Sequence, residues 1–371
     1  MPDGALQLKF KRSEGRRVKT MDTHTLKARF QASVEAPVTR DKLVALATRC
    51  AEAGGKASAQ DRMDIAAALA HTAFLAPDRT AEIYDALAEG WCGRVVKATP
   101  IEGFDRPPEL APEDLWDDYW SIVEDGLAGE LDALSITQRT AALGHHSNET
   151  AVARIAEMSH MFEGVTEAAS GDLPDLIKLS TLAACPKGSL GAEFHDLIVD
   201  NKFDLEVLDR TEIGIGKLPT PLDYLNTRML QAHDLWHITA GYQTTALHEI
   251  AISAFQMAQF GHNYSAQFLS ITAVMGALGP GKSYRFLMDT ITSAWVHGRE
   301  SPALISIAWE EVWDQPVEKI RRTYGIKAYE SPYPADIIER NQGMMEKIDF
   351  VKGLLRRLMA PFSRRYQVNQ P

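Results

Sequence analysis

Residues 232–250 read AHDLWHITAGYQTTALHEI, and this stretch decides how we expect the chain to fold. Positions four apart share one face of a helix, so His233 and His237 can direct their imidazoles to one point. Asp234 and Glu249 add carboxylates, although Asp234 is rotated by about 100° from His233 on the same helix. Two imidazoles with one or two carboxylates suit Zn²⁺, Fe²⁺ or Mn²⁺. The stretch therefore predicts a divalent metal site.

A change of chain direction is needed before Glu249 can join the histidines. On one straight helix, the twelve positions from His237 to Glu249 would separate them by roughly 18 Å. Gly241 is suited to end the first helix, and Thr244 or Thr245 is suited to cap the next one. We therefore expect two helices that reverse at the glycine and bring Glu249 to face the imidazoles.

Each residue of this motif also has a structural interpretation. A single histidine on a helix is more often a packed or surface residue than a metal ligand. Asp234 can be a ligand, or it can orient an imidazole through a hydrogen bond instead. The metal hypothesis depends on the combination of an i, i+4 histidine pair with carboxylates within reach.

The composition describes a globular, acidic protein. The 371 residues are 45% hydrophobic and 24% charged, which is enough for one large or two modest domains. Residues 1–40 hold nine basic and four acidic residues, a net charge of +5, so the rest carries −16 within a total of −11. An acidic body argues against nucleic-acid binding. Cys50, Cys92 and Cys185 lack CxxC spacing, which favours a reducing compartment without a disulfide framework.

The chain divides into four predicted regions. Residues 1–36 are expected to form a basic, poorly ordered leader, because their charges come without an apolar face. A start at Met21 and attraction to an anionic membrane surface are the alternatives for this region. The others are an N-terminal helical region over 37–170, a metal-binding core over 171–330, and a C-terminal helix and tail over 331–371.

Apolar spacing predicts helices almost throughout and no period-two strand pattern, so the expected fold class is all-α. Two helices are expected within 40–75, and the prolines between 103 and 112 mark a linker. A largely helical stretch is expected over 295–326, with a new helix starting at Pro316, and one long helix over 334–358. The expected architecture is a multi-helix orthogonal or bundle fold around the helix pair that carries the His-Asp-His and Glu motif.

The stretch from Ile250 to Gly281 contains no Lys, Arg, Asp or Glu. A break at Gly261 divides it into two apolar helices. Two buried core helices are the first interpretation, and an apolar lining for a long ligand chain is the second. Burial in the core is the default expectation. No segment of the chain reads as a signal peptide or a membrane-spanning helix.

Three basic residues are candidates for binding an anionic part of a substrate. Lys282 and Arg285 follow the glycine-rich turn GALGPGK, and Arg299 lies among apolar residues further along the chain. The alternative for the first two is that they solvate the start of a helix.

A second His-Asp doublet, His195 and Asp196, supports a rival hypothesis. HD-type phosphohydrolases combine a separate histidine, such a doublet and a later aspartate on a helical fold. This hypothesis leaves His237 and Glu249 without a role, and a doublet arises easily by chance. It is therefore the weaker interpretation.

The motif and its neighbours resemble the coenzyme Q (ubiquinone) biosynthesis protein four family. The signature is His-Asp-x-x-His, then eleven residues, then Glu, and it is complete here. The flanking segments that agree are CPKGSLGAEF, GALGPGK, HGRESPALI and WEEVWDQPVEKIRRTYGI. The resemblance covers roughly Leu179 to Ile326.

The resemblance implies an all-helical, often dimeric protein, peripherally associated with a membrane and with other ubiquinone biosynthesis proteins. For this chain that means a cytoplasmic location on the inner membrane. It also implies removal of the carboxylate at ring carbon 1 of a polyprenylated 4-hydroxybenzoate. By position, His233, Asp234, His237 and Glu249 would be the metal ligands, with zinc the first choice and iron or manganese the alternatives.

The chemistry of this reaction requires both a cation and an acid. Direct loss of CO₂ would leave an unstable aryl carbanion, whereas protonation of the ring carbon first gives a dienone that loses CO₂ readily. A cation can stabilise the phenolate oxygen or position the carboxylate. Glu249, a water molecule or His248 would supply the proton. An oxidative variant would need a redox-active metal instead of zinc.

A non-catalytic function is the alternative. In that hypothesis the protein is a lipid-binding scaffold that organises the ubiquinone biosynthesis complex, and the metal is a structural link between two helices. The sequence fixes neither the metal nor the length of the isoprenoid chain.

Overall fold

The structure, a computed structural model, describes residues 23–36, 39–131, 133–201, 205, 210 and 215–341, and within these ranges every regular element is a helix. The α-helices of the first half are α1 (Thr23–Glu35), α2 (Arg40–Ala53), α3 (Ala59–Ala70), α4 (Thr80–Cys92), α5 (Glu113–Ala128), α6 (Ala133–Leu143), α7 (Glu149–Ser159) and α8 (Val165–Ala168). Those of the second half are α9 (Leu179–Ala183), α10 (Leu190–Asn201), α11 (Leu222–Ala240), α12 (Ala246–Phe260), α13 (Asn263–Leu278), α14 (Gly281–Arg299), α15 (Val317–Tyr324) and α16 (Ile337–Asn341). The predicted all-α fold class is confirmed.

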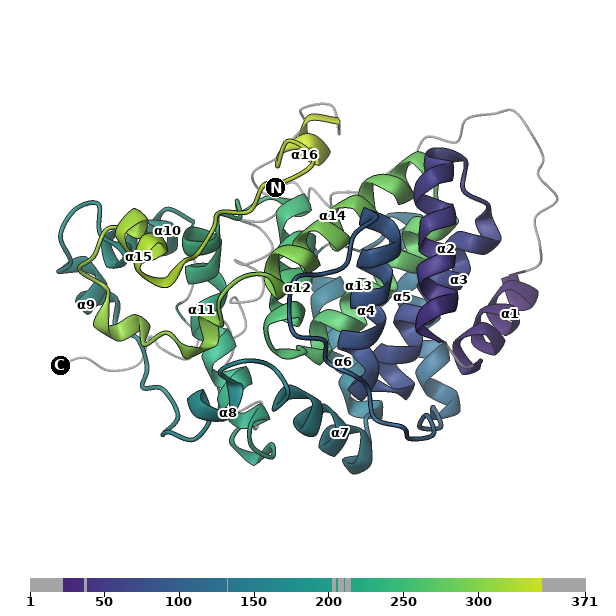
Figure 1. The fold of residues 1–371 in the computed structure, drawn as a ribbon, viewed down its shortest axis with the longest axis horizontal. Coiled ribbons are helices and arrows are strands. Elements are labelled where there is room, and N and C mark those ends of the chain that lie inside the picture. The colour runs from purple at the N-terminus through teal and green to yellow at the C-terminus, as the bar shows by residue number, and fades with distance from the viewer. Residues whose placement is uncertain are drawn as a thin grey trace, which may run out of the picture.

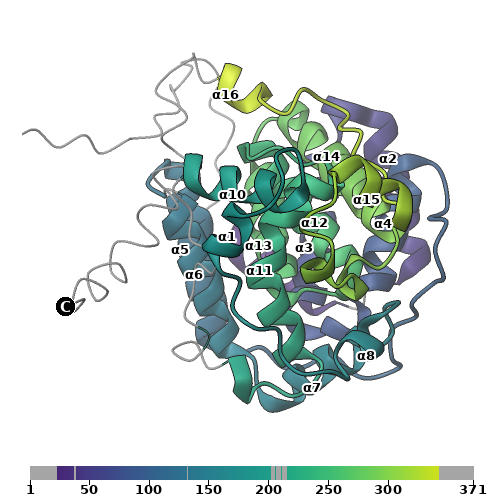
Figure 2. The same ribbon diagram turned by 90° about the vertical axis from the view of Figure 1, so that its left-hand side faces the viewer.

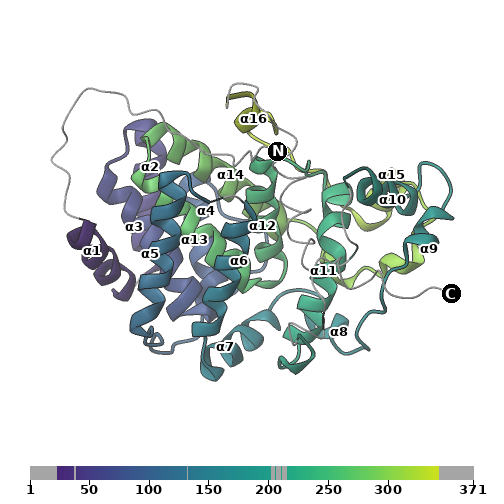
Figure 3. The same ribbon diagram turned by 180° about the vertical axis from the view of Figure 1, so that it is seen from behind.

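The helices gather in two groups of unequal size. Figure 1 shows α1 to α6 together with α12, α13 and α14 in the larger group, and α9, α10 and α15 in the smaller one. In the side view of Figure 2, α10, α11 and α15 lie in front of the larger group. Figure 3 shows the opposite face, where α5 and α6 cover α13, against which both pack. Helix α11, which carries both motif histidines, lies where the two groups meet.

The charge-free stretch forms the centre of the larger group. Helix α12 packs against α14, and α13 packs against α3 and α5. The side chains of Ile252, Phe255, Ile271 and Val274 have no exposed surface. Each such side chain contributes about 1.5–3 kcal/mol through burial. The core interpretation of this stretch is confirmed.

The predicted boundary at residue 170 does not separate two packing units. Helix α3 packs against α13, and α4 packs against α14, so helices from both sides of the boundary share one core. The division of the chain at this residue stays a prediction about function. No helix among the described residues is long and apolar enough to cross a bilayer.

The prediction of a disordered leader is wrong for residues 23–35, which form helix α1. Phe30 and Val34 lie four residues apart on one face, and their exposed fractions are 1% and 0%. The ring of Phe30 stacks on that of Tyr119, with 5.8 Å between the centroids. The apolar face that was thought to be missing is therefore present. The basic part of the predicted leader, residues 1–22, lies outside the described residues.

The predicted helical stretch over 295–326 is interrupted. Helix α14 ends at Arg299, and residues 300–316 contain only two short 3₁₀ turns before α15 begins after Pro316. Pro302 disfavours a helical conformation for the residue before it, which explains the break. Leu304 is fully buried, and its backbone N–H donates to Gln259 Oε1 at 2.9 Å. Of the helix predicted over 334–358, the structure describes α16, and residues 342–371 lie outside the described residues.

Candidate metal centre

The predicted reversal of the chain is confirmed, and it builds the site. Gly241 ends α11 with φ of 80°, and its N–H donates to the carbonyl oxygen of His237 at the helix end. Thr245 then caps α12, where its side chain accepts a hydrogen bond from the N–H of His248. A left-handed φ of this kind favours glycine, because a Cβ would crowd the following carbonyl. Glu249 consequently lies in the first turn of the returning helix.

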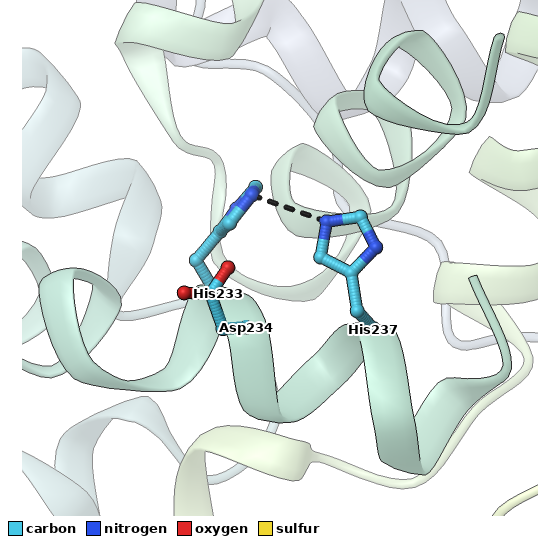
Figure 4. A group of neighbouring side chains, drawn as sticks. All are labelled: His233, Asp234 and His237. Carbon is cyan, nitrogen blue, oxygen red and sulfur yellow. Dashed lines mark hydrogen bonds between the residues drawn. The ribbon is translucent and has the colours of Figure 1, made fainter. Parts of the chain in front are cut away.

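Glu249 faces both motif histidines. Its Oε2 lies 3.5 Å from His233 Nε2, and its Oε1 lies 3.4 Å from His237 Nε2. The two Nε2 atoms are 3.2 Å apart, the contact drawn as a dashed line in Figure 4. Three potential ligand groups from two helices therefore converge on one point.

The three distances fit the ligands of a small divalent cation. Ligand atoms about 2.0–2.1 Å from a tetrahedral zinc ion lie roughly 3.3 Å from one another. The observed separations, 3.2, 3.4 and 3.5 Å, are close to that value. The arrangement of donor atoms thus suits zinc, and a site of two imidazoles and a carboxylate also suits iron or manganese.

Asp234 lies beside the histidine pair. Its carboxylate and one nitrogen of each ring of His233 and His237 are all within 4.8 Å of one another, so these three residues form a group that could hold a metal ion. Burial raises the pKa of Asp234, although both imidazoles act in the opposite direction. Figure 4 shows that Asp234 and His233 project from adjacent positions of α11. Asp234 is therefore close enough to the histidine pair to join the cluster as a ligand.

The ring of His237 is held in the tautomer that a ligand needs. Its Nδ1 lies 3.2 Å from the backbone carbonyl oxygen of Tyr242, to which it donates. A proton on Nδ1 leaves the lone pair of Nε2 free for a cation. The side chain of His237 is 2% exposed, whereas those of His233 and Glu249 are 35% and 32% exposed. The site is thus closed behind His237 and open beside the other two.

Charges at the site favour an ionised carboxylate between the rings. Burial alone would raise the pKa of Glu249, but the charges and hydrogen bonds of His237 and His233 outweigh it and hold that pKa well below its usual range. For His233 the directions are reversed. Burial alone would lower the pKa of its ring, but the hydrogen bond and the charge interaction with Glu249 outweigh burial and raise that pKa. Glu249 is consequently an anion at neutral pH, as a metal ligand must be.

His248 lies next to Glu249 on α12, and its ring is bound to the backbone of the turn between the two helices. Its Nδ1 accepts a hydrogen bond of 2.8 Å from the backbone N–H of Gln243. Burial, assisted by His237, lowers the pKa of His248 to about 4. A histidine with that pKa is neutral at pH 7, and its ring packs edge-on against Tyr329. A neutral ring is a weak proton donor, and the role of His248 in protonation stays a prediction.

The three predicted substrate-binding cations lie away from the motif. Lys282 and Arg285 occupy the first turns of α14, where Lys282 packs against Gly55. Arg299 lies at the other end of α14, roughly 21 Å from Arg285 by the rise of a helix. Its side chain is 7% exposed and contacts Asp85 at 3.2 Å. These residues stabilise contacts between helices, and the structure does not bring them to the histidines.

The rival His-Asp doublet lies on α10, in the smaller group of helices. His195 Nδ1 is 3.2 Å from Asp196 Oδ1, and the side chain of Asp196 is 76% exposed. The pair is therefore a surface contact between neighbours. Nothing in its surroundings among the described residues forms a second cluster of potential ligands.

One residue next to the motif was missed by the sequence reasoning. Gln256, on α12, is 3% exposed, and its Nε2 lies 2.5 Å from His233 Nδ1. It follows Glu249 by seven positions, which places both on the same face of the helix. That spacing was the available signal, but a glutamine in an apolar stretch does not point to a metal site by itself.

Comparison with known proteins gives one family for this part of the chain. Residues 173–330 match the sequence model of the family described as "Coenzyme Q (ubiquinone) biosynthesis protein Coq4". The matched segment includes α11, α12 and the whole motif, and it contains the range over which the resemblance was predicted. This segment is therefore similar to Coq4 proteins.

Individual relatives agree with the family match. Over 167 residues the chain is 29% identical to the mitochondrial ubiquinone biosynthesis protein COQ4 homolog of Rattus norvegicus, covering 43% of this chain and 57% of that protein. The homolog of Danio rerio is 25% identical over 159 residues, which are 41% of this chain and 54% of the relative. The chain spans a little over half the length of these curated relatives.

A solved structure is also similar. It is a protein of Nostoc punctiforme provisionally described as a ubiquinone biosynthesis protein, 24% identical, with a TM-score of 0.44. The similarity covers 59% of this chain and all of the other. A likeness of this size carries no argument about the site.

Proposed function

We propose that this chain acts in ubiquinone biosynthesis as a metal-dependent decarboxylase at ring carbon 1 of a polyprenylated 4-hydroxybenzoate. The observation that carries the proposal is the position of Glu249, whose two carboxylate oxygens lie 3.5 and 3.4 Å from Nε2 of His233 and His237. The pathway comes from the similarity of residues 173–330 to the family described as a ubiquinone biosynthesis protein, whereas the reaction and the substrate class are what the resemblance of the motif implies. The matched segment contains α11 and α12, the two helices that carry these three residues.

Some groups of the site would bind the cation, and others orient the rings that bind it. His233, His237 and Glu249 would hold the cation, and Asp234 would either join them or stay beside them as a protonated carboxyl. A divalent cation bound there supplies a Lewis acid that can stabilise a phenolate oxygen or position a carboxylate. The carbonyl oxygen of Tyr242 keeps the proton of His237 on Nδ1. The buried side of the cluster thus fixes its geometry before a substrate arrives.

The reaction needs one proton at the ring carbon. The carboxylate leaves as CO₂, its bonding electrons return to the ring, and a hydrogen takes its place, so the net change is exchange of CO₂ for a proton. Glu249 is ionised and His248 has a pKa of about 4, so neither holds a proton to donate at pH 7. Where Asp234 is not itself a ligand, it is the remaining acidic group of the cluster, because burial raises its pKa.

The open side of the cluster is where a substrate would enter. His233 and Glu249 are each about one third exposed, while His237 behind them is buried. The charge-free helices α12 and α13 are occupied by core packing, which argues against the interpretation that they line a channel for the polyprenyl chain. We propose instead that the polyprenyl tail of the substrate stays outside the larger helix group and that only its aromatic ring reaches the cluster.

Localisation and partners belong to the same proposal. The names of the curated relatives place those proteins in mitochondria. For this chain we propose peripheral attachment to the inner membrane from the cytoplasmic side, a homodimeric state, and contacts with other ubiquinone biosynthesis proteins. Co-sedimentation with vesicles and light scattering of the full chain test the first two.

The test of the function uses a strain that lacks this protein. The strain should accumulate a prenylated aromatic carboxylate, and the wild-type chain should remove it, whereas His237→Ala should not. His195→Ala, which changes a half-buried histidine on α10 outside the motif, is the matched control and should complement fully. Absence of the precursor from the deletion strain would overturn the proposed reaction. Failure of His195→Ala, together with phosphate-ester hydrolysis by the wild type, would favour the phosphohydrolase hypothesis.

A scaffold function is the second hypothesis, and one observation favours it. The cluster joins α11 to α12, so a cation there would also link two core helices. In that case His233→Ala should lower the melting temperature and abolish partner pull-down. A variant that folds and binds partners but no longer removes the precursor would exclude a purely structural role.

A further inference from the structure

Gln256 lies on the same face of α12 as Glu249, and both residues contact the ring of His233. Glu249 Oε2 is 3.5 Å from His233 Nε2, and Gln256 Nε2 is 2.5 Å from His233 Nδ1. The glutamine is 3% exposed, so this contact is shielded from water. The ring is therefore held at both nitrogens by residues two helical turns apart.

The protonation of the ring decides whether His233 can bind a cation. A neutral imidazole has one N–H and one lone pair, so a ring that coordinates through Nε2 carries its proton on Nδ1. That N–H then needs an acceptor in this buried position. The terminal amide of Gln256 offers an oxygen acceptor and a nitrogen donor of nearly the same size. A rotation of 180° about the Cγ–Cδ bond of Gln256 exchanges its amide oxygen and its amide nitrogen, so that either group can face Nδ1 of His233.

We propose that Gln256 is a positioning residue of the metal centre, whose amide oxygen accepts the Nδ1–H of His233 and keeps the Nε2 lone pair directed at the cation. The inference rests on the metal site of the proposed function and adds a residue outside the His-Asp-x-x-His and Glu motif. With the amide turned the other way, its nitrogen donates to Nδ1 and the ring proton sits on Nε2. There it points at Glu249 and His237, and the ring cannot bind a metal. The exchange moves the ring proton from one nitrogen to the other without a net gain or loss.

The two histidine rings are oriented by different kinds of acceptor, and only the acceptor of His233 can be removed by a side-chain substitution. The acceptor for His237 Nδ1 is the backbone carbonyl of Tyr242, which no side-chain substitution removes. The acceptor for His233 is a side chain. Residues that orient metal-bound histidines typically change metal affinity by 10–100-fold when they are replaced, and we expect about that effect here.

The test compares two substitutions of nearly equal size in the full chain. Gln256→Met keeps the volume but offers no acceptor to a ring N–H, whereas Gln256→Glu offers only acceptors. Zinc affinity is measured by competition with a chromophoric chelator, and cobalt is bound in parallel to record its visible spectrum. We expect Gln256→Met to bind zinc about 10–100-fold more weakly, and Gln256→Glu to bind at least as tightly as the wild type. The cobalt spectrum of Gln256→Glu should match the wild type.

Melting temperatures in excess chelator separate orientation from packing. If Gln256 acts only in packing, both substitutions will change stability without separating in metal affinity, and the inference is overturned. Equal zinc affinity of the wild type and Gln256→Met also overturns it while leaving the metal site intact. A wild-type chain that binds neither zinc nor cobalt overturns the metal site and this inference together.

Discussion

The carboxylate of Glu249 lies 3.4 Å from Nε2 of His237, although the two residues belong to different helices. The contact exists because α11 ends at Gly241 and α12 returns beside it. Every chemical property that we assign to the site depends on this return.

Replacing Glu249 by Gln should remove the negative charge and keep the shape. We expect zinc affinity to fall by more than about a hundredfold, because loss of a ligand should cost more than loss of an orienting neighbour. Competition titration measures the affinity. Replacing Glu193 by Gln on α10 is the control, and it should leave zinc binding unchanged because that residue lies outside the motif. Similar affinities for the wild type and Glu249→Gln would exclude the carboxylate as a ligand.

Replacing Gly241 by Ala should destabilise the fold and disturb the site. Its φ is +80°, and a Cβ there would come within 2.8 Å of Ala328 Cβ and 3.2 Å of the Tyr329 nitrogen. We expect a loss of about 2–4 kcal/mol in the free energy of unfolding, from backbone strain and crowding together.

Gly93→Ala is the matched control for this turn. Gly93 has φ of +68°, but a Cβ there would meet nothing within 4 Å. Its cost should be only the backbone part, about 1–2 kcal/mol. Urea denaturation measures both variants, and equal losses would show that crowding at Ala328 contributes nothing.

Acidification should destabilise the protein partly through His71. Its Nδ1 donates to the carbonyl oxygen of Val34 at 2.7 Å, and burial lowers its pKa below the usual value. The folded state holds the neutral ring, while the unfolded chain takes up a proton below about pH 6.5. The stability is therefore complete above that pH and is lost as the pH falls towards the lower pKa of the folded state.

Urea midpoints at pH 7.5 and pH 5.5 measure this effect. His71→Gln should be less stable than the wild type at pH 7.5 but should lose less on acidification. His145→Gln, at an exposed position, should keep the wild-type dependence on pH. If His71→Gln keeps the full dependence, the loss has another origin.

Truncating Phe30 should reveal how firmly α1 is attached. The ring stacks on Tyr119 and meets Trp116 and Trp120 edge-on, with centroids 6.2 and 5.3 Å away. Phe30→Ala should cost about 3–5 kcal/mol in the free energy of unfolding, as for other buried aromatic residues. Lys27→Ala on the same helix, whose side chain is 32% exposed, is the control and should cost little. A small loss for Phe30→Ala would mean that α1 is only loosely packed.

The sequence was most informative where local rules determine the structure. Gly241 and Thr245 carry the standard signals for a helix end and a helix start, so the reversal could be predicted from them. The i, i+4 spacing of His233 and His237 then fixed their shared face. These are local properties of the chain, and tertiary packing did not override them.

Other features depend on contacts between distant segments, which a pattern within one segment does not reveal. Phe30 looked isolated because its partner Tyr119 lies 89 positions away. Arg299 looked available for a ligand because its partner Asp85 lies 214 positions away in the sequence. Gln256 was missed for the same reason, since its contact with His233 exists only after the chain has reversed.

The central claim is that His233, His237 and Glu249 together hold a divalent metal ion. It is tested most directly by metal analysis of the purified full chain beside His237→Ala and the control His195→Ala, which lies outside the motif, all shown to be folded by circular dichroism. We predict about one zinc, iron or manganese ion per chain in the wild type and in His195→Ala, and almost none in His237→Ala. A folded wild-type chain without metal after growth and purification in zinc-, iron- and manganese-supplemented conditions, or an equal metal content in His237→Ala, would contradict the claim.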